Sequence, residues 1–294
     1  MPIWKEYTVP HTIHDALQSL AEASQPACIV AGGTDLLLDL QQNRHPPVST
    51  LVDVTQIPAL NALEIRQEQL FIGAAVPLVR ILSSTLVQRY ALALVEACQL
   101  IGGPQVRNTA TLGGNVAHAL PAADGAIALL ALRAQVEIVD RSGSRFAPLE
   151  TLYQGPGKSS LHANQELLVG FSLPLAAPGE ASAFQRVMRP QGVALPVLNL
   201  AVWLQRFKDT ILDLCIAVGP AGPVPYRAAQ AEAALRGAIF TPQVLQSACQ
   251  ALLENARFRT SPQRATQAYR RHLADGLLRQ VMSSAWERAG NLAA

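Results

Sequence analysis

The sequence predicts an α+β protein built from two domains. Its 294 residues exceed the ~100–200 of a typical single domain, and 50% of them are hydrophobic, which is enough to bury a large core. Helical and strand-like patterns alternate over the first part of the chain, as in an α/β domain. Beyond residue 182, two strand-like patterns precede several helical ones, which indicates an antiparallel hairpin packed by helices.

The N-terminal domain is expected to begin with an amphipathic helix. Thr12 and Asp15 resemble a capping box, and the apolar stripe that follows has helical spacing. The stripe consists of Ile13, Ala16, Leu17, Leu20 and Ala21. Short apolar stretches predict strands at residues 27–31, 49–54, 69–74, 134–140 and 165–175. Two helices are predicted between these strands, one at 123–134 and one at 86–101, the latter stopped by Gly102, Gly103 and Pro104.

The segment AAPGEAS (176–182) marks the domain boundary because it combines Pro, Gly and small residues without periodicity. We therefore predict an N-terminal domain over residues 1–177 and a C-terminal domain over 178–294. The second domain begins with alternating strands at 198–207 and 211–219, joined by a turn at 208–210. Helices are predicted at 227–237 and 242–256, followed by a basic C-terminal helix.

The basic C-terminal helix carries an apolar stripe and several arginines. The stripe comprises Ala265, Ala268, Tyr269, His272 and Leu273, which leaves Arg264, Arg270, Arg271 and Arg279 on other faces. A solvated surface and a docking surface for an acidic partner both account for this pattern. The formal net charge of the whole chain is only +2, so nucleic acid is not expected as a partner.

Composition and spacing argue against a membrane protein or a secreted one. No uninterrupted apolar run reaches the ~20 residues of a membrane span. The N-terminus lacks a basic region followed by an apolar one, so it is not a secretory signal. Cys28, Cys98, Cys215 and Cys249 show no metal-ligand spacing, which argues against zinc or iron–sulfur sites in this chain. We expect reduced structural cysteines and a cytoplasmic protein.

A glycine pair follows the predicted strand at residues 27–31. Gly32 and Gly33 precede Thr34 and Asp35 in AGGTDLLLDL. Glycines between a strand and a helix allow successive backbone N–H groups to point into one concavity, which suits a phosphate. Thr34 would add a hydroxyl donor, and Asp35 would cap the helix that opens at Leu36.

A second glycine pair lies much further along, in TLGGNVAHALPAAD (111–124). Gly113 and Gly114 stand between Thr111 and Asn115, so this loop repeats the small polar setting of the first. One such loop is weak support for a ligand site, because a glycine pair before a helix is often only a tight turn. Two of them would suit a diphosphate that is held from two sides.

Two common nucleotide-binding motifs do not fit these loops. Asp53 ends a strand about 20 residues after the first glycines, as the ribose-binding acid of a Rossmann unit does. However, G-x-G-x-x-G fails whether it opens at Gly32 or at Gly33, because non-glycine residues occupy the other glycine positions. The G-x-x-x-x-G-K-[ST] loop of nucleoside triphosphatases is also absent.

The segments IVAGGTDLLLDLQQNR and GGPQVRNTATLGGNVAHALPAADGAIALLAL resemble the two signatures of the FAD-binding medium subunit of molybdenum hydroxylases. That family includes xanthine dehydrogenase and aerobic carbon monoxide dehydrogenases. Supporting matches run almost from end to end of the chain. The resemblance implies a two-lobed FAD-binding domain of the vanillyl-alcohol-oxidase (PCMH) type, followed by a small C-terminal domain.

The resemblance also implies which residues bind FAD, without a covalent link. The two loops would hold the diphosphate, Asp124 would accept hydrogen bonds from cofactor hydroxyls, and three further positions would lie near the flavin. The complete set is Ile29, Val30, Ala31, Gly32, Gly33, Thr34, Asp35, Leu36, Ile101, Thr111, Leu112, Gly113, Gly114, Asn115, Asp124, Leu168 and Arg186.

Several of these assignments have plainer alternatives. Asp124 could simply cap the helix that follows it, and Ile101 and Leu168 could be ordinary core residues. The register that selects Arg186 over the neighbouring Gln185 is open, and a surface arginine would fit the sequence as well.

The chain departs from the family pattern at two positions. Leu120 stands where a serine is common, which removes one hydrogen bond near the cofactor. His118 stands where asparagine or a similar residue is common. Its most economical interpretation is a packed or solvent-facing side chain rather than a covalent flavin attachment. No cysteine cluster interrupts the chain, so an additional iron–sulfur centre is not expected.

The resemblance predicts a flavoprotein oxidoreductase subunit that works in electron transfer. A large subunit would carry the molybdenum cofactor and a small subunit [2Fe–2S] clusters, in a dimer of heterotrimers. No residue here looks like a general base or nucleophile, so no catalytic or metal-binding residue is predicted. The alternatives are a stand-alone flavin oxidoreductase, and an assembly or binding protein that has lost the flavin. Neither the substrate nor the acceptor (NAD, a quinone or oxygen) is predictable.

Overall fold

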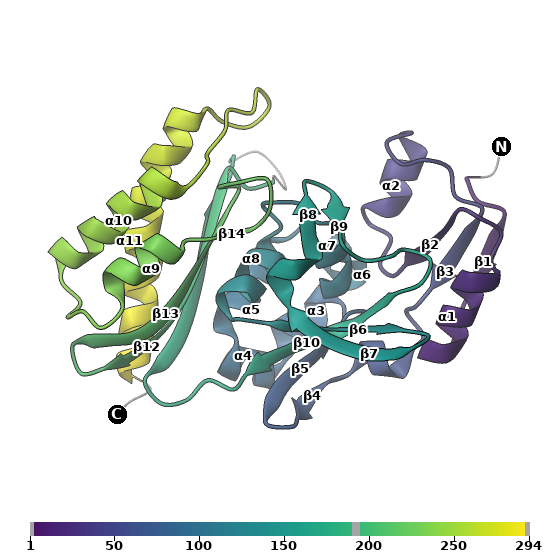
Figure 1. Cartoon of the computed structure of the whole chain (residues 1–294), viewed down its shortest axis with the longest axis horizontal. Coiled ribbons are helices and arrows are strands. Elements are labelled where there is room, and N and C mark those ends of the chain that lie inside the picture. Colours follow the sequence, from purple (N-terminus) through teal and green to yellow (C-terminus); the bar gives the residue numbers. More distant parts are fainter. Residues whose placement is uncertain (1–2, 190–194, 292–294) are drawn as a thin grey trace.

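The polypeptide folds into three units that lie side by side along the long axis of the molecule (Figure 1). A computed structural model describes residues 3–189 and 195–291. The first two units form the N-terminal half of the chain, and the third is the C-terminal domain. Within the described ranges, no helix is both long and apolar enough to span a membrane.

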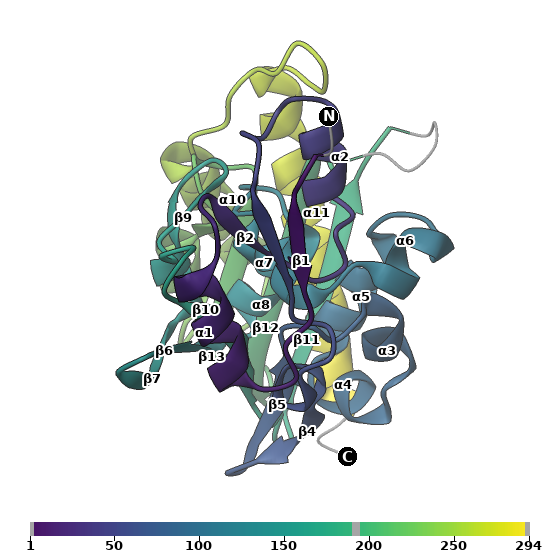
Figure 2. The same cartoon turned by 90° about the vertical axis from the view of Figure 1, so that its right-hand side faces the viewer.

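The N-terminal unit is a small parallel sheet with two helices. The sheet has the order β1-β3-β2 and consists of β1 (Glu6–Thr8), β3 (Thr50–Asp53) and β2 (Ala27–Val30). Figure 2 looks onto this unit, with α2 (Leu36–Gln41) at its upper end and α1 (Ile13–Glu22) at its lower end. The N-cap half of the predicted capping box is confirmed, because the Thr12 hydroxyl accepts a hydrogen bond of 3.0 Å from the Asp15 amide.

The central unit is built on a five-stranded antiparallel sheet with the order β4-β5-β10-β6-β7. Its strands are β4 (Leu63–Arg66), β5 (Gln69–Gly73), β10 (Leu167–Pro174), β6 (Gln135–Asp140) and β7 (Gly143–Pro148). The middle strand β10 is buried along nearly its whole length, which explains its continuous apolar sequence. Short 3₁₀ turns at Pro58–Asn61 and Leu149–Leu152 and a hairpin of β8 (Tyr153–Gly155) and β9 (Lys158–Ser159) complete the strand-bearing segments.

Six helices accompany this sheet. They are α3 (Leu78–Ser83), α4 (Thr85–Tyr90), α5 (Leu92–Leu100), α6 (Pro104–Thr109), α7 (Leu112–Ala117) and α8 (Asp124–Ala131). All residues of α8 are buried, because this helix lies between the central unit and the C-terminal sheet.

The C-terminal domain is a four-stranded antiparallel sheet covered on both faces (Figure 1). The strands are β11 (Glu180–Val187), β12 (Leu198–Phe207), β13 (Thr210–Gly219) and β14 (Tyr226–Arg227). The helices α9 (Ala229–Leu235), α10 (Pro242–Asn255) and α11 (Gln267–Asn291) cover one face. On the other face, Ala201 and Ala217 join the central core, and their small side chains allow α8 to approach the sheet closely.

Three expectations about these elements are wrong or incomplete. The helix predicted at 86–101 is two helices, α4 and α5, because Ala91 between them adopts φ −144° and ψ 50°. Strand β11 was not predicted, although it begins at Glu180 inside the segment 176–182. The predicted hairpin at 198–219 is therefore only the middle of a four-stranded sheet.

The C-terminal helix also differs from its predicted register. Arg270 is buried in the structure, whereas Tyr269 is 48% exposed. The inward face of α11 runs through Ala274, Leu277, Leu278 and Val281. Arg270 precedes these residues at helical spacing and therefore faces inward with them.

We expect the central core to dominate the stability of the N-terminal half. Leu94 of α5 is fully buried, so Leu94→Ala should lower the free energy of unfolding by ~2–5 kcal/mol through lost burial and a residual cavity. Leu212→Ala is the matched control, because Leu212 is 46% exposed on β13 and its truncation should cost less than about 0.5 kcal/mol. Denaturant titration of both variants checks this, and equal losses would contradict it.

Candidate functional site

A cleft of about 1100 Å³ lies where the three units meet. Its volume is slightly above the ~300–1,000 Å³ of ordinary small-ligand pockets, so it can accept an elongated ligand. All but one of the residues predicted to bind the cofactor line this cleft. They are Ile29, Val30, Ala31, Gly32, Gly33, Thr34, Asp35, Leu36, Ile101, Thr111, Gly113, Gly114, Asn115, Asp124, Leu168 and Arg186.

Leu112 is the predicted residue that does not reach the cleft. Its side chain is fully buried in the central hydrophobic core. Its amide donates a hydrogen bond of 3.2 Å to the Val76 carbonyl, so its backbone is also engaged. Leu112 therefore supports the cleft wall from behind.

The first glycine loop presents an open array of backbone amides to the cleft. It joins β2 to α2, and none of the amides of residues 31–36 donates a hydrogen bond to another described residue. Gly33 has φ +66°, in the left-handed region that favours glycine. A nest of unpaired amides is a good site for a phosphate, because each N–H is a donor that water or a ligand must satisfy.

The second glycine loop is built differently, and the expectation of a second open amide nest is wrong. Gly113 and Gly114 lie inside the first turn of α7 rather than in a turn before it, and Thr111 is the N-cap. The Gly113 amide donates to the Ala74 carbonyl at 2.8 Å, and the Gly114 amide donates to the Thr111 hydroxyl at 3.1 Å. Both amides therefore already have acceptors within the protein.

Close packing explains why the second loop needs glycine. A Cβ atom placed on Gly113 would lie 2.5 Å from the Ala74 carbonyl oxygen. The absence of a side chain lets α7 rest directly on the chain that leaves β5.

The two loops meet each other, as the pairing of their motifs predicts. A Cβ atom on Gly32 would lie 2.1 Å from the carbonyl oxygen of Thr109, just before the second loop. In addition, His118 Nδ1 lies 3.8 Å from Asp35 Oδ2, so His118 in its protonated form makes an ion pair that links the end of α7 to the start of α2. His118 therefore has a partner across the cleft wall and is neither simply packed nor simply solvent-facing.

The Asp35 carboxylate does not cap α2, contrary to expectation. Asp35 occupies the N-cap position, but its side chain makes no capping hydrogen bond. The interaction with His118 lowers the pKa of Asp35 below its usual value. The same interaction raises the pKa of His118, although partial burial opposes the charged form.

A buried polar cluster closes the cleft beside α8. The Asp124 and Arg186 side chains form an ion pair in which each is only 4% exposed. Asn199 Nδ2 donates to the other Asp124 oxygen at 2.6 Å and to the Ala122 carbonyl at 3.1 Å. Burial raises the pKa of Asp124, while Arg186 and Asn199 favour its ionised form.

This cluster bears on two alternatives that the sequence left open, the helix-cap interpretation of Asp124 and the register of Arg186 against Gln185. Ala123 is the N-cap of α8 and Asp124 is the first helical residue, so the helix-cap interpretation of Asp124 is wrong. Arg186, rather than Gln185, pairs with Asp124 and lines the cleft.

Several residues of the cleft and of the polar cluster beside it were missed by sequence reasoning. Asn199 could have been noticed as the single polar residue in the apolar run LNLAVWL. Arg259, Arg264 and Arg270 also line the cleft. Arg264 and Arg270 were assigned to the predicted basic surface, because helical periodicity alone placed Arg270 on the wrong face, and Arg259 was not singled out.

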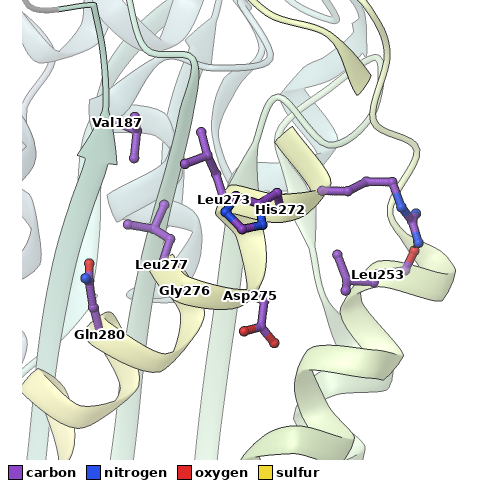
Figure 3. Close-up of a pocket in the computed structure, with 9 residues that line it drawn as sticks. Val187, Leu253, His272, Leu273, Asp275, Gly276, Leu277 and Gln280 are labelled. Atoms are coloured by element: carbon purple, nitrogen blue, oxygen red, sulfur yellow. The ribbon is translucent and has the colours of Figure 1, made fainter. Parts of the chain in front are cut away.

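A smaller hollow of about 560 Å³ lies elsewhere, between α10, α11 and the end of β11 (Figure 3). Leu253, Leu273 and Leu277 contribute apolar side chains to its lining, and His272 and Asp275 also line it. None of the predicted cofactor residues lines it. Among the described residues, no group of His, Cys, Asp and Glu side chains is arranged to hold a metal ion.

The residues of the large cleft fit a flavin dinucleotide. The open amides of residues 31–36 suit a diphosphate. Two buried polar atoms that lack partners in the structure, Asn115 Oδ1 and Arg186 Nε, belong to residues that line the same cleft. Buried polar atoms are normally paired, so unpaired ones in a cleft indicate a ligand that supplies the partner.

Comparisons with known proteins agree with this geometry. Residues 4–176 match the family model described as the FAD binding domain in molybdopterin dehydrogenase. Residues 182–285 match the CO dehydrogenase flavoprotein C-terminal domain.

Individual relatives cover almost the whole chain. The xanthine dehydrogenase FAD-binding subunit of Escherichia coli O157:H7 is 32% identical over 95% of this chain and 95% of its own length. The carbon monoxide dehydrogenase medium chain of Hydrogenophaga pseudoflava is 27% identical over 96% and 97% of the two chains. A solved structure of carbon monoxide dehydrogenase from that organism, lacking the Mo-pyranopterin moiety of its molybdenum cofactor, superposes with a TM-score of 0.92. It is 28% identical and covers 98% of this chain and 99% of the solved one.

The His118–Asp35 pair predicts that the contact between the loops depends on pH. Because His118 has a raised pKa in the folded protein, its stabilising contribution is complete below its ordinary value of 6.5 and is lost as pH rises through the folded pKa. The pKa of Asp35 is lowered below its ordinary value of 3.8, so on the acid side the stabilising contribution of the pair is lost only as pH falls through that lowered pKa. Titration of the histidine ring protons by NMR should give a His118 pKa above 6.5, and Asp35→Asn should return it toward 6.5. An unchanged His118 pKa in that variant would contradict the pair.

Proposed function

This chain belongs to the family of FAD-binding domains in molybdopterin dehydrogenases, and we propose that it is the FAD-carrying electron-transfer subunit of a molybdenum-dependent hydroxylase or dehydrogenase. The observation that carries the proposal is the row of unpaired amides at residues 31–36, which faces a cleft of about 1100 Å³. Such an array is costly unless it is satisfied by an anionic ligand or by water.

We assign different tasks to the residues of the cleft. The amides of residues 31–36 would hold the diphosphate of FAD, with the Thr34 hydroxyl as a further donor. From the second loop, Thr111, Gly113, Gly114 and Asn115 would form the facing wall. The asparagine would offer its unpaired buried oxygen.

The remaining residues would position the rest of the cofactor. Asp124 would accept hydrogen bonds from cofactor hydroxyls, because each carboxylate oxygen has more than one acceptor site and keeps capacity beside Arg186 and Asn199. Ile101 and Leu168 would supply apolar contacts, and Ile29, Val30 and Leu36 would complete the first wall. Bound FAD would take up two electrons and release them to an external acceptor.

The chemistry asked of this chain is binding and orientation. Electrons would arrive from iron–sulfur centres of a partner subunit, and the substrate would be oxidised at a molybdenum centre in a large subunit. Such a transfer requires no general base or nucleophile in this chain. The relatives support this division of labour through their names, which describe a FAD-binding subunit and a medium chain. We propose a dimer of heterotrimers in the cytoplasm, which fits the four unpaired cysteines.

The two rival functions have less support. An assembly protein without flavin would be expected to fill the loop region with side chains, whereas the open amides and the volume of the cleft favour a ligand. A stand-alone flavin oxidoreductase would need a substrate pocket next to the flavin. The second hollow, between α10, α11 and the end of β11, shares no lining residue with the cleft.

FAD binding should depend on the backbone conformation of the first loop. Gly33→Val introduces a β-branched side chain at φ +66° and should weaken FAD binding at least ~10-fold, because one or two amide–phosphate hydrogen bonds are lost. Flavin fluorescence during titration measures the dissociation constant.

Gly237→Val is the matched control for backbone strain. Gly237 has φ +77°, a Cβ atom placed on it would have no other atom within 4 Å, and it lies outside the cleft. Like Gly33→Val, this variant should lose ~1–2 kcal/mol of folding stability through backbone strain, but it should keep the FAD affinity of the wild type. Equal FAD affinity in both variants would contradict the assignment of the loop.

The assembly is testable in the native host. An affinity-tagged chain should co-purify with two partner proteins, and metal analysis of the eluted complex should find molybdenum and iron in fixed proportion to FAD. Addition of a reductant that acts at the molybdenum centre should bleach the flavin absorbance in the complex but not in the isolated FAD-loaded chain. Recovery of the tagged chain as a lone active flavoprotein would support the stand-alone oxidoreductase instead.

A further inference from the structure

Asn199 is a fully buried polar residue in the apolar strand β12. It faces α8 together with Ala201, because residues two apart lie on the same face of a strand. Its Oδ1 atom is buried and has no hydrogen-bond partner among the described residues. An unpaired buried acceptor costs free energy, so any favourable contribution of this side chain comes from its amide nitrogen.

The amide nitrogen of Asn199 holds the start of α8. Nδ2 donates to Asp124 Oδ1 at 2.6 Å and to the Ala122 carbonyl at 3.1 Å. Both partners are acceptors, so only the amino group of the side chain can occupy this place. The two bonds fix the carboxylate relative to the backbone that immediately precedes it, and an Asp124 side chain in another rotamer would lose the first of them.

The neighbouring strands leave space for this amide. Arg186 of β11 and Gly219 of β13 are the cross-strand partners of Asn199, so the three residues form one row on the face toward α8. A Cβ atom placed on Gly219 would lie 2.7 Å from Asn199 Oδ1 and 2.5 Å from the Pro121 carbonyl oxygen. The missing side chain of Gly219 therefore allows the Asn199 amide to reach the start of α8.

Asn199 and Arg186 hold different oxygens of the same carboxylate. Arg186 pairs with Asp124 Oδ2 and Asn199 with Oδ1, which fixes the plane of the carboxylate. Each oxygen keeps a further acceptor site, and Asp124 lines the large cleft. The remaining acceptor sites are therefore presented to a ligand in the one orientation that both donors allow.

The charge of Asp124 also depends on these neighbours. Burial raises the pKa of Asp124, whereas Arg186 and Asn199 favour its ionised form. Cys98 of α5 is the other titratable group that interacts with Asp124. Burial, and then the charge of Asp124, raise the pKa of the Cys98 thiol, so this thiol stays neutral at neutral pH and adds no negative charge.

We propose that Asn199 is a positioning residue for FAD, which holds the Asp124 carboxylate in the orientation that accepts hydrogen bonds from cofactor hydroxyls. This inference rests on the proposed function, in which Asp124 contacts the cofactor. Arg186 alone would balance the charge of Asp124 but would leave one oxygen without a protein donor. Because hydrogen bonds are directional, fixing both oxygens in advance lowers the entropic cost of binding.

Asn199→Asp in the full chain tests this role, because aspartate has the same shape and places a second carboxyl group beside Asp124. Two such groups share a proton at low pH and repel each other when both are ionised. The FAD dissociation constant of the variant should lie within about fivefold of the wild-type value near about pH 5 and at least about 10-fold above it near about pH 8.5. Flavin fluorescence measures both constants, and their ratio removes the pH effects that the two proteins share, including that of the His118–Asp35 pair.

Asn199→Ala removes the donor altogether and gives a second readout should Asn199→Asp fail to fold. This variant should weaken FAD binding about 10-fold at neutral pH, because the Asp124 carboxylate loses one of its two protein donors.

Ser182→Ala is the matched control. Ser182 is buried in β11, its hydroxyl accepts a hydrogen bond of 3.1 Å from the Ala93 amide of α5, and it lies outside the cleft. The variant also loses a buried hydrogen bond between the C-terminal domain and the central unit, so its denaturant midpoint should fall. Its FAD affinity should stay within about twofold of the wild-type value at every pH.

Several results would overturn the inference. A pH-independent ratio for Asn199→Asp would do so, as would wild-type FAD affinity in Asn199→Ala. Equal losses of FAD affinity in Asn199→Ala and Ser182→Ala would assign Asn199 to domain packing alone. These outcomes leave the proposed function intact, since the wild type still binds FAD. Absence of FAD binding by the wild type would refute the proposed function and this inference with it.

Discussion

The carboxylate of Asp124 enters the interior where α8 begins, and the protein compensates for it with groups from another domain. Arg186 of β11 and Asn199 of β12 both bind this carboxylate, so two strands of the C-terminal sheet are tied to the first residue of a central helix. Removing one partner of such a buried pair typically costs ~3–5 kcal/mol, because the other charge is left without compensation. The cluster thus joins two of the three units whose residues form the walls of the cleft.

The two glycine motifs serve one cleft in different ways. The first loop keeps its amides unpaired, so it is a surface for a ligand, while the second has its amides paired and is a rigid support. Gly32 and Gly113 are both needed for close approach, since a Cβ on either would meet a backbone carbonyl of a neighbouring segment. The Asp35–His118 pair then joins the two loops through side chains. The second loop, whose amides are paired, thus holds the first loop, whose amides are unpaired, in a fixed position. Such preorganisation lowers the entropic cost of ligand binding.

Two walls of the cleft carry groups that favour anions by different means. The N-terminal wall offers neutral backbone dipoles, whereas the C-terminal wall offers the full charges of Arg259, Arg264 and Arg270. Between them, the charge of Asp124 is balanced by Arg186 and does not repel an anionic ligand strongly. The C-terminal wall of the cleft therefore carries local positive charge, although the formal net charge of the whole chain is only +2.

Local patterns in the sequence determined much of the protein. The cap and stripe of α1 and the apolar strands β2, β3, β5, β6 and β10 were predictable, because capping and periodicity act within a few residues. The convergence of both glycine motifs on one cleft was predicted by the pairing of the motifs and by the family resemblance. Tertiary structure decided the rest. The amides of Gly113 and Gly114 donate hydrogen bonds that no local pattern reveals. The break at Ala91 and the pairing of β11 depend on distant neighbours. Arg270 faces inward because residues two and three turns later set the buried face of α11. Hydrogen-bond partners and helix register are settled by packing between segments far apart in the chain, and a sequence window does not contain them.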